Sequence, residues 1–439
     1  MSAELISILV LVVVFVIATT RSINMGALAF AAAFGVGELV ADLDADGIFA
    51  GFPGDLFVVL VGVTYLFAIA RANGTTDWLV HAAIRLVRGR IALIPWVMFA
   101  ITGALTAIGA VSPAAVAIVA PIALSFAARY GISPLLMGAL VVHGAQAGGF
   151  SPISIYGSIV NGVVERENLP GNELVLFFAS LVVNLIIAAI VFVLFGGLKL
   201  KGRDLETETD GQGQRKENGN GQGQGQDKSG DAGALAADAA RLTPARIATL
   251  TALAALVVAV LVFDLDAGLS AITLAVILSA FWPDASRKAV GEVAWPTVLL
   301  ICGVLTYVGV LEEMGTIEYA GNAVGDIGVP LLAAVLLCYI AAIISAFASS
   351  VGIMGALIPL AVPFLAQGEI GAVGMIAALA VSATVVDVSP FSTNGALVLA
   401  AAPDVDRERF FRQLMVYGGI VVAAVPAAVW LVLVVPGFG

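Results

Sequence analysis

The sequence is poor in charge: only 12% of its residues are Asp, Glu, Lys or Arg, whereas 60% are hydrophobic. Mean hydropathy is +1.05. Apolar runs of about 20 residues, the length of a helix that crosses a bilayer, recur along almost the whole chain. These features exclude an ordinary soluble globule and predict an all-α integral protein of the plasma (inner) membrane, in contact with the lipid bilayer.

Cysteine and histidine are scarce as well, with two residues of each. Cys302 and Cys338 stand alone in apolar runs, which excludes a disulfide framework and a cysteine metal site. The net charge of −11 argues against nucleic acid as a partner. The first apolar run, Leu5–Thr19, lacks both a basic stretch before it and a small-residue cleavage site, so we interpret it as a retained span. No cofactor and no structural metal are expected.

The chain repeats itself. A Ser-Pro-Ile-Ser motif at 151–154 returns as Ser-Pro-Phe-Ser at 389–392, and a glycine follows each copy after the same interval, at Gly157 and Gly395. Residues 74–78 return in similar form at 315–319. Proline and glycine within apolar segments predict interrupted helices. Two interrupted spans in matching positions are typical of secondary transporters, whose sites lie at the interruptions.

The repetition divides the chain into a first membrane repeat at 1–201, a disordered cytoplasmic linker at 202–243 and a second repeat at 244–439. The Gly-Gln-rich composition of the linker cannot build a core. Each repeat is expected to have about five spans, one of them a broken helix, at 133–164 and 371–402. The apolar pairs at 91–129 and 329–366 have weakly polar turns, which favours re-entrant helical hairpins over the alternative of two full spans. The other predicted spans are 5–20, 24–41, 51–71, 174–197, 244–263, 266–282, 294–311 and 412–435.

An odd number of crossings makes the second repeat enter from the opposite face, so the repeats are expected to be inverted. This arrangement places 19 of the 20 lysines and arginines on one side of the membrane and only Arg166 on the other. The positive-inside rule assigns the basic side to the cytoplasm. Both termini are then expected outside.

The interruptions are the first candidate site. Carbonyls freed by a broken helix suit a small cation, and the amides of the helix that resumes suit an anion. The alternative is a kink whose backbone groups are satisfied by serine and threonine hydroxyls. At the hairpin tips, small residues permit close backbone approach, with tight helix packing as the alternative. The predicted substrate-binding residues are Ser112, Ser151, Ser154, Ser349, Ser350, Ser389, Ser392, Thr393 and Asn394.

Asp387 is the only acid between Glu369 and Asp404, inside an apolar stretch. A carboxylate at the bilayer centre costs about 2.5–3.5 kcal/mol on insertion scales, so it is a functional candidate, with capping of backbone amides as the alternative. His143 is either a proton carrier or a hydrogen-bonded packing residue. No lysine or arginine is expected near the breaks or tips. The residues predicted to hold a coupling cation, Na⁺ or H⁺, are Asp387, Gln146, Gly148 and His143.

Several stretches resemble the malonate and dicarboxylate carriers of the MatC type, within the ion transporter superfamily that includes the divalent anion:sodium symporters. The resemblance covers about the first 200 residues and is carried most sharply by His143–Gly157 (HGAQAGGFSPISIYG), together with Asn24–Phe30, Ile48–Phe57, Val63–Ala70 and Ile94–Phe99. It implies a homodimer in which a transport domain moves against a scaffold in an elevator mechanism. The symporters carry Ser-Asn-Thr at each hairpin tip, which this sequence lacks.

The sequence thus favours a cation-coupled importer of a small dicarboxylate, malonate first among them, and not an enzyme. A cation/proton antiporter that uses Asp387 is the alternative within transport. A membrane-embedded enzyme with His143 and Asp387 as an acid-base pair, and a passive channel, are remote alternatives.

Overall fold

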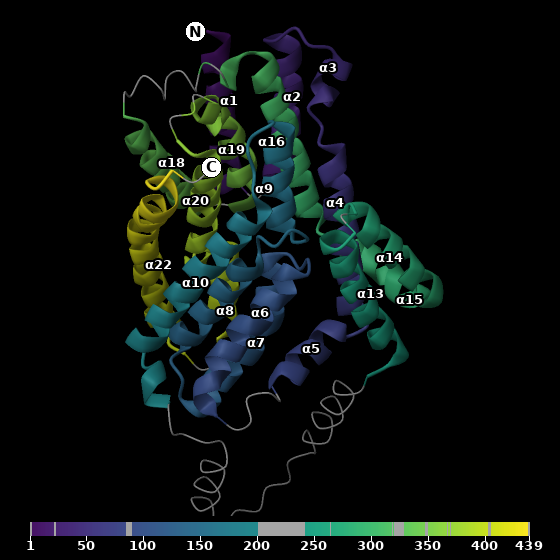
Figure 1. Ribbon diagram of the computed structural model, residues 1–439, viewed down its shortest axis with the longest axis vertical. Helices are drawn as coiled ribbons and strands as arrows, with labels where there is room; N and C mark the ends of the chain where they lie inside the picture. The colour runs from purple at the N-terminus through teal and green to yellow at the C-terminus, as the bar shows by residue number, and fades with distance from the viewer. Residues whose placement is uncertain are drawn as a thin grey trace, which may run out of the picture.

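The computed structural model describes residues 2–21, 23–84, 90–200, 242–263, 265–317, 319, 329–346, 350–366, 368, 370–402 and 405–437. The elements in this part of the chain are helices (Figure 1). Seven of them are long and apolar enough to cross a membrane, and five shorter apolar helices accompany them. The predicted all-α membrane fold is therefore confirmed. Most of the predicted linker, and Ser349 at the second hairpin tip, lie outside the described residues.

The first half contains α1 (Ala3–Thr20), α2 (Met25–Leu39), α3 (Ala45–Ala50), α4 (Gly54–Ala72), α5 (Thr75–Ile84), η2 (Ile91–Leu93), α6 (Ile94–Ala107), α7 (Ser112–Tyr130), α8 (Pro134–Gly148), α9 (Ile155–Arg166), α10 (Glu173–Leu194) and η3 (Gly197–Leu200). The second half contains α13 (Pro244–Leu261), α14 (Ala267–Phe281), α15 (Pro283–Gly291), α16 (Trp295–Glu313), α18 (Pro330–Ser345), α19 (Ser350–Ala366), α20 (Ala372–Val385), η4 (Val386–Val388), α21 (Thr393–Ala401), α22 (Arg407–Val429) and η5 (Trp430–Val434).

Local sequence sets many helix starts. Asn24 accepts hydrogen bonds from the first amides of α2, and Asn172 caps α10 in the same way. Ser133 caps α8, and Pro134 follows at the first helical position, where its missing amide costs nothing. Asp406 caps α22. This cap starts α22 several residues before the predicted span at 412, because the charged first turns of the helix belong to no apolar run.

The helices form two groups. The flanking group consists of α1–α4 and α13–α16, in which α2 packs on α16 and α4 packs on α14. Backbones touch in both pairs: a Cβ on Gly26 would lie 1.9 Å from the Leu299 carbonyl oxygen, and one on Gly62 would lie 2.5 Å from that of Gly268. Small residues of this kind are how membrane helices approach closely. Each pair joins one helix from each half of the chain.

The central group consists of α6–α10 and α18–α22, and its contacts also occur in matching pairs. Helix α6 packs on α8 as α18 packs on α20, α21 contacts α7 as α9 contacts α19, and α10 contacts α20 as α22 contacts α8. In Figure 1 the hairpin α6–α7 lies toward the lower end and α18–α19 toward the upper end. The two groups meet where α16 contacts α19 and α4 contacts α9.

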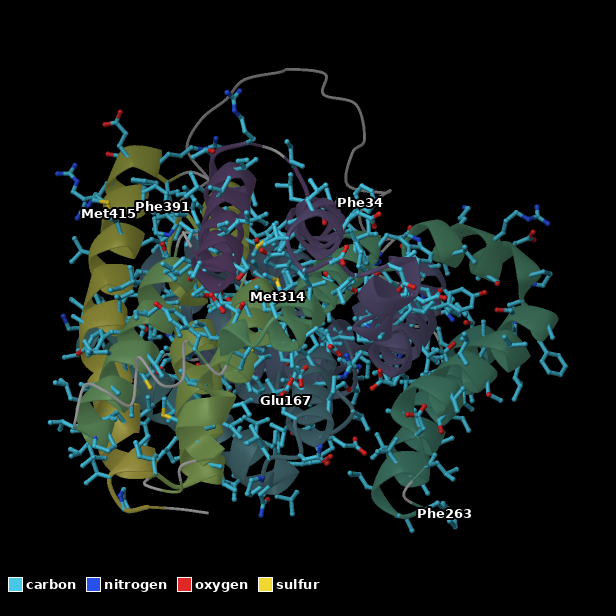
Figure 2. All side chains as sticks on the ribbon, turned by 90° about the horizontal axis from the view of Figure 1, so that it is seen from above. Phe34, Glu167, Phe263, Met314, Phe391 and Met415 are labelled. Carbon is cyan, nitrogen blue, oxygen red and sulfur yellow. The ribbon has the colours of Figure 1, made fainter. Side chains whose placement is uncertain are left out.

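Seen from above, Glu167 and Met314 lie near the middle of the molecule, whereas Phe263 lies at its rim (Figure 2). Phe263 is 68% exposed, and large apolar side chains are also exposed along α10 and α14. Such surfaces are suited to acyl chains. By contrast, α8 and α20 are buried along nearly their whole length. The two broken helices are thus the core of the central group.

Candidate functional site

The first interruption separates α8 from α9 and is held together by a serine. The Ser154 hydroxyl donates to the carbonyl oxygens of Gly149 (2.5 Å) and Ser151 (2.7 Å). It also accepts from the Gly157 amide at 3.2 Å, which caps α9. A second hydroxyl, that of Ser151, donates to the Ala107 carbonyl at the end of α6. The break is therefore closed locally and tied to the first hairpin.

The second interruption, between α20 and α21, has the same construction. The Ser392 hydroxyl donates to the carbonyls of Asp387 and Ser389, and it accepts from the Gly395 amide at 3.2 Å. Glycine is required at the capped position in both copies, since a Cβ on Gly395 would lie 1.9 Å from the Ser389 carbonyl oxygen. The Ser389 hydroxyl accepts from the Phe391 amide. The alternative weighed from the sequence, backbone groups satisfied by hydroxyls, fits the contacts of these serines: Ser151, Ser154 and Ser392 donate to carbonyls, and Ser389 accepts from an amide.

Polar side chains from both halves meet between the breaks and the hairpins. We call them the polar cluster. The Gln146 amide nitrogen, at the end of α8, donates to Asp387 Oδ2 at 2.7 Å. It also lies 3.4 Å from the hydroxyl of Ser112, the first residue of α7. The members of the cluster are Ser112, Gln146, Ser345, Ser350, Asp387 and Asn394, each no more than 6% exposed.

The second hairpin completes the cluster. The Ser350 hydroxyl, at the start of α19, donates to Asp387 Oδ1 at 2.5 Å, and Ser345 at the end of α18 donates to Ser350 at 2.8 Å. From α21, the Asn394 amide nitrogen donates to the Ser112 hydroxyl at 2.8 Å and lies 3.5 Å from Asp387 Oδ2. One carboxylate therefore contacts the second hairpin and both broken helices.

Two oxygen atoms in the cluster are buried without a hydrogen-bond donor from any residue that the structure describes: Gln146 Oε1 and Asn394 Oδ1. Each such acceptor costs about 1–3 kcal/mol when left unpaired. The ion pairs Arg71–Glu292 and Arg166–Asp55 do not involve Asp387. A buried carboxylate beside two amide oxygens is a set of hard oxygen donors, which suits a small cation or a proton and repels an anion.

His143 is not part of the cluster. Its Nδ1 faces Asn184 Oδ1 at 2.8 Å, and its Nε2 faces the Tyr417 hydroxyl at 2.6 Å. The Asn184 amide nitrogen donates to the Ser180 carbonyl, so its oxygen is the atom directed at the ring. Nδ1 therefore carries the proton and Nε2 accepts from Tyr417. With both ring nitrogens occupied, His143 connects α8, α10 and α22.

Two more predicted residues, Gly148 and Thr393, also lie apart from the cluster. A Cβ on Gly148 would lie 1.9 Å from the Gly103 carbonyl oxygen, so this glycine allows α8 to pack against α6. The Gly148 carbonyl accepts from the Ser151 amide. Thr393 is exposed at the start of α21. The structure thus brings together Ser112, Gln146, Ser350, Asp387 and Asn394 among the predicted residues.

Sequence reasoning missed one member of the cluster, Ser345, and one neighbour, Tyr156. Ser345 is the last residue of the apolar helix α18, and nothing in the sequence distinguishes it from other serines. Tyr156 is 3% exposed, and its phenol interacts with Ser112 and Asp387. A signal for Tyr156 existed, because it occupies the position in the first Ser-Pro copy that Asn394 occupies in the second.

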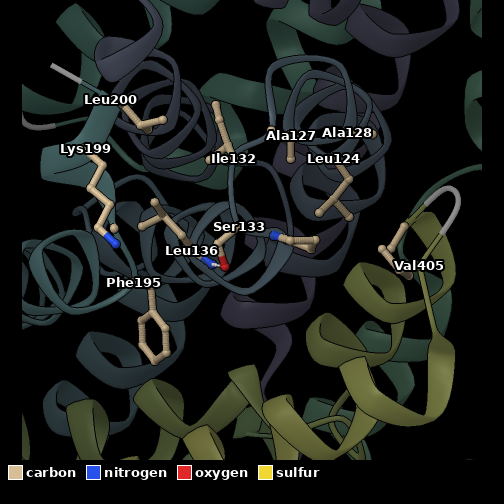
Figure 3. A pocket seen from close by; sticks show the side chains of 14 residues that line it. Leu124, Ala127, Ala128, Ile132, Ser133, Leu136, Phe195, Lys199, Leu200 and Val405 are labelled. Carbon is tan, nitrogen blue, oxygen red and sulfur yellow. Dashed lines mark hydrogen bonds between the residues drawn. The ribbon is translucent and has the colours of Figure 1, made fainter. Parts of the chain in front are cut away.

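The expectation that no basic residue lies near a tip is wrong. Arg71, at the end of α4, lines a cavity of about 260 Å³ together with Gly109, Val111 and Pro113 of the first hairpin tip. The sequence places Arg71 far from residues 109–113, and only the packing of the flanking group against the hairpin brings them together. A separate cavity of about 730 Å³ lies between the end of α7, the start of α8, the segment 195–200 that includes η3, and residues that follow α21 (Figure 3). Its lining includes Lys199 and no member of the polar cluster.

Comparison with known proteins adds two findings. Residues 1–149 match the family model described as dicarboxylate carrier protein MatC N-terminus, which confirms the resemblance over this part of the chain. The fold is similar to that of the YdaH transporter from Alcanivorax borkumensis, with a TM-score of 0.58, 14% identity and coverage of 89% of each chain. No curated protein matches. The family match indicates a carrier and not an enzyme, as the sequence predicted.

Proposed function

We propose, on the premise that residues 1–149 belong to the dicarboxylate carrier family they match, that this chain is a secondary transporter that imports a small dicarboxylate together with a cation. Malonate is the first substrate to test. The observation that carries the proposal is the polar cluster: one buried carboxylate, Asp387, lies at the meeting point of both broken helices and both hairpins, beside two unpaired amide oxygens.

The cation is needed for two physical reasons. Bringing a dianion into a cell with a negative interior costs about 4.6 kcal/mol per 100 mV, which two co-transported cations cancel. In addition, Asp387 repels a dianion until a cation or proton neutralises it. A bound cation then offers the substrate a positive partner next to the Ser112 hydroxyl. Gln146, Asn394 and Asp387 hold the cation in this scheme.

The movement proposed is an elevator, in which the central group of helices slides against the flanking group in a homodimer. The matching contacts of the two halves and the opposite placement of the two hairpins support inverted repeats as the basis of this movement (Figure 1). We propose that the termini face outside and that residues 202–243 link the halves in the cytoplasm, as the distribution of basic residues predicts.

A cation/proton antiporter is the second candidate, because a single buried carboxylate is sufficient to alternate between a proton and a metal cation. The two candidates differ in whether an organic substrate moves. An antiporter would exchange cations for protons with no dicarboxylate present, and malonate would leave the exchange rate unchanged.

Uptake of radiolabelled malonate into proteoliposomes tests the proposal. The purified chain is reconstituted, and uptake is measured with an inward Na⁺ gradient, an inward proton gradient or no gradient. We expect accumulation above equilibrium with one of the gradients only. In parallel, a pH-sensitive dye inside the vesicles reports cation/proton exchange with and without malonate.

Absence of uptake under every gradient would remove malonate from the proposal. Succinate and oxalate in the same assay then decide whether any small dicarboxylate is carried. Cation-driven pH changes without dicarboxylate would favour the antiporter. Protein-free vesicles give the background for each measurement.

A further inference from the structure

The cavity at the first hairpin tip is lined by two charged residues, Arg71 at the end of α4 and Glu292, which follows α15. The tip itself, between the end of α6 and the start of α7, also lines the cavity. Uncharged residues of α4 and of the start of α16 complete the lining. The volume of about 260 Å³ is roughly nine times the 30 Å³ that one water molecule occupies in the liquid. The cavity has room for a small diacid.

Arg71 uses only part of its hydrogen-bonding capacity. Its Nε and Nη2 both donate to one oxygen of Glu292, Oε2, at 3.1 and 2.8 Å. A guanidinium usually binds a carboxylate through two parallel hydrogen bonds to two oxygens. Here the fork converges on a single oxygen, and the Nη1 donors have no protein partner among the described residues. A second carboxylate has donors available to it.

The ion pair is also weak enough to exchange partners. The Arg71 side chain is 38% exposed and that of Glu292 is 45% exposed. Pairs with this exposure contribute about 0–1 kcal/mol because water and salt screen them. A dicarboxylate that enters the cavity can therefore replace Glu292 on Arg71 at little cost. The Glu292 carboxylate thus occupies the position on Arg71 that a ligand carboxylate would take.

The cavity borders the polar cluster through the hairpin tip. Val111 and Pro113 line the cavity, and Ser112 between them directs its hydroxyl to Gln146 and Asn394. One side of the tip thus faces the guanidinium, and the other faces the cluster. A substrate that leaves the cluster past this tip meets Arg71 next.

The other half of the chain has no basic counterpart at this position. Arg71 lies three residues before Gly74, a glycine with φ of +74°, and Glu312 lies three residues before Gly315, with φ of +70°. The matching position of the second half therefore carries an acid. The repeat itself therefore does not require a guanidinium at this position. A role on the side of the first hairpin alone would explain why Arg71 is found in one half only.

We propose, as an extension of the dicarboxylate transport proposed above, that Arg71 is a second carboxylate-binding position on the first hairpin's side, where Glu292 competes with the substrate. The polar cluster binds the substrate through a cation, and Arg71 binds it directly. Removal of Arg71 therefore weakens substrate binding. Removal of the Glu292 charge frees the guanidinium and strengthens substrate binding.

The test compares the two partners of this ion pair. Binding of radiolabelled malonate to the purified full chain, and malonate counterflow in proteoliposomes, are measured for wild type, Arg71→Gln, Arg71→Lys and Glu292→Gln. We expect Arg71→Gln to raise the half-saturating malonate concentration about tenfold and Glu292→Gln to lower it about threefold, as loss or gain of a charge-assisted hydrogen bond implies. Arg71→Lys should be intermediate. Arg166→Gln, which removes the other exposed ion pair, is the matched control and should leave the value unchanged.

Opposite shifts for the two partners distinguish a binding position from a structural ion pair, since loss of a structural pair shifts both variants in the same direction. Equal or absent shifts, in a wild-type protein that exchanges malonate, overturn this inference and leave the proposed function intact. If Arg71→Gln does not fold, the sign of the Glu292→Gln shift decides. A wild-type protein that exchanges no dicarboxylate contradicts the proposed function, and this inference with it.

Discussion

The two interrupted helices share their backbone construction and differ in the groups they present. In each, one serine donates to two carbonyls and caps the helix that resumes: Ser154 in the first and Ser392 in the second. Each also has a glycine at the capped amide, where a Cβ would overlap a carbonyl oxygen. The repeated motif thus specifies how a helix is broken and resumed, with a serine hydroxyl bonded to backbone groups on both sides of the break.

The chemistry lies at positions that are not repeated. Asp387 occupies the position that Gly149 has in the first break, and Asn394 occupies that of Tyr156. The first break contributes Gln146 to the cluster, and its counterpart in the second is Thr384, whose hydroxyl donates within its own helix. A repeat can therefore be symmetric in backbone and asymmetric in charge. One carboxylate in place of two avoids the repulsion of like charges in a buried site.

Removal of the Asp387 charge is expected to have the largest effect on this asymmetry. Asp387→Asn keeps the shape but removes the only charge of the cluster, so cation affinity should fall about 10–100-fold, the loss of one hydrogen bond or contact to a charged group. The measurement is malonate uptake as a function of Na⁺ and proton concentration. Asp55→Asn, an exposed acid of the Arg166 ion pair, is the control.

An Asp387→Asn protein with unchanged ion dependence would mean that the two breaks are equivalent in function as well as construction. The cluster would then have to act through its neutral oxygens alone. The measurement therefore decides whether the difference between the breaks matters.

The equality of the two breaks can be tested through stability. Ser154→Ala and Ser392→Ala each remove a helix cap and the hydroxyl's hydrogen bonds to two carbonyls, so each should cost about 1–2 kcal/mol of stability. Thermal unfolding of the purified variants should show similar decreases in Tm. The exposed Ser125, whose hydroxyl donates only to Ile122 in its own helix, is the control for a serine removed without such consequences. A loss confined to one variant would show that the two serines are not equivalent.

Much of the fold was predictable because membrane helices are marked by long apolar runs. The proline motifs also indicated the interruptions. The early start of α22 was not predictable from hydropathy, since Asp406 determines it through a hydrogen bond to the Arg409 amide. The short helices α3 and α15 were missed for a similar reason. Caps and charged turns add helix outside the apolar runs that predict the spans.

The site was predictable to the level of residue type and not to the level of role. Asp387 and Gln146 were selected because polar groups in apolar sequence are rare. The assignment of the break serines to a ligand, however, could not foresee that their hydroxyls would form hydrogen bonds with neighbouring backbone groups. His143 could not be placed, because Asn184 and Tyr417 come from helices whose contact with α8 the sequence does not reveal. The proximity of Arg71 to the first hairpin tip could be found only from the tertiary structure, for the same reason.

The smallest expected effect concerns the C-terminal ends of α9 and α21, the helices that resume after the breaks. Here it is the first half of the chain, and not the second, that carries a partly buried acid. Helix α21 ends in alanine, whereas α9 is followed by Glu167, which is half-buried near Glu312. Burial, and then the Glu312 carboxylate, raise the pKa of Glu167 from 4.5 to about 7, and Arg166 opposes the shift. The folded state therefore binds the proton more tightly than the unfolded state, and stability from this group is complete below pH 4.5 and is lost as pH rises to 7. Because solvent screens a half-exposed group, the loss should not exceed about 1 kcal/mol.

Glu167→Gln should thus raise Tm relative to wild type at pH 8 and leave it unchanged at pH 4.5. The exposed neighbour Glu165, changed to Gln, serves as the control. A Tm difference that is the same at both pH values would contradict the raised pKa of Glu167. The ends of α9 and α21 would then not differ in proton binding.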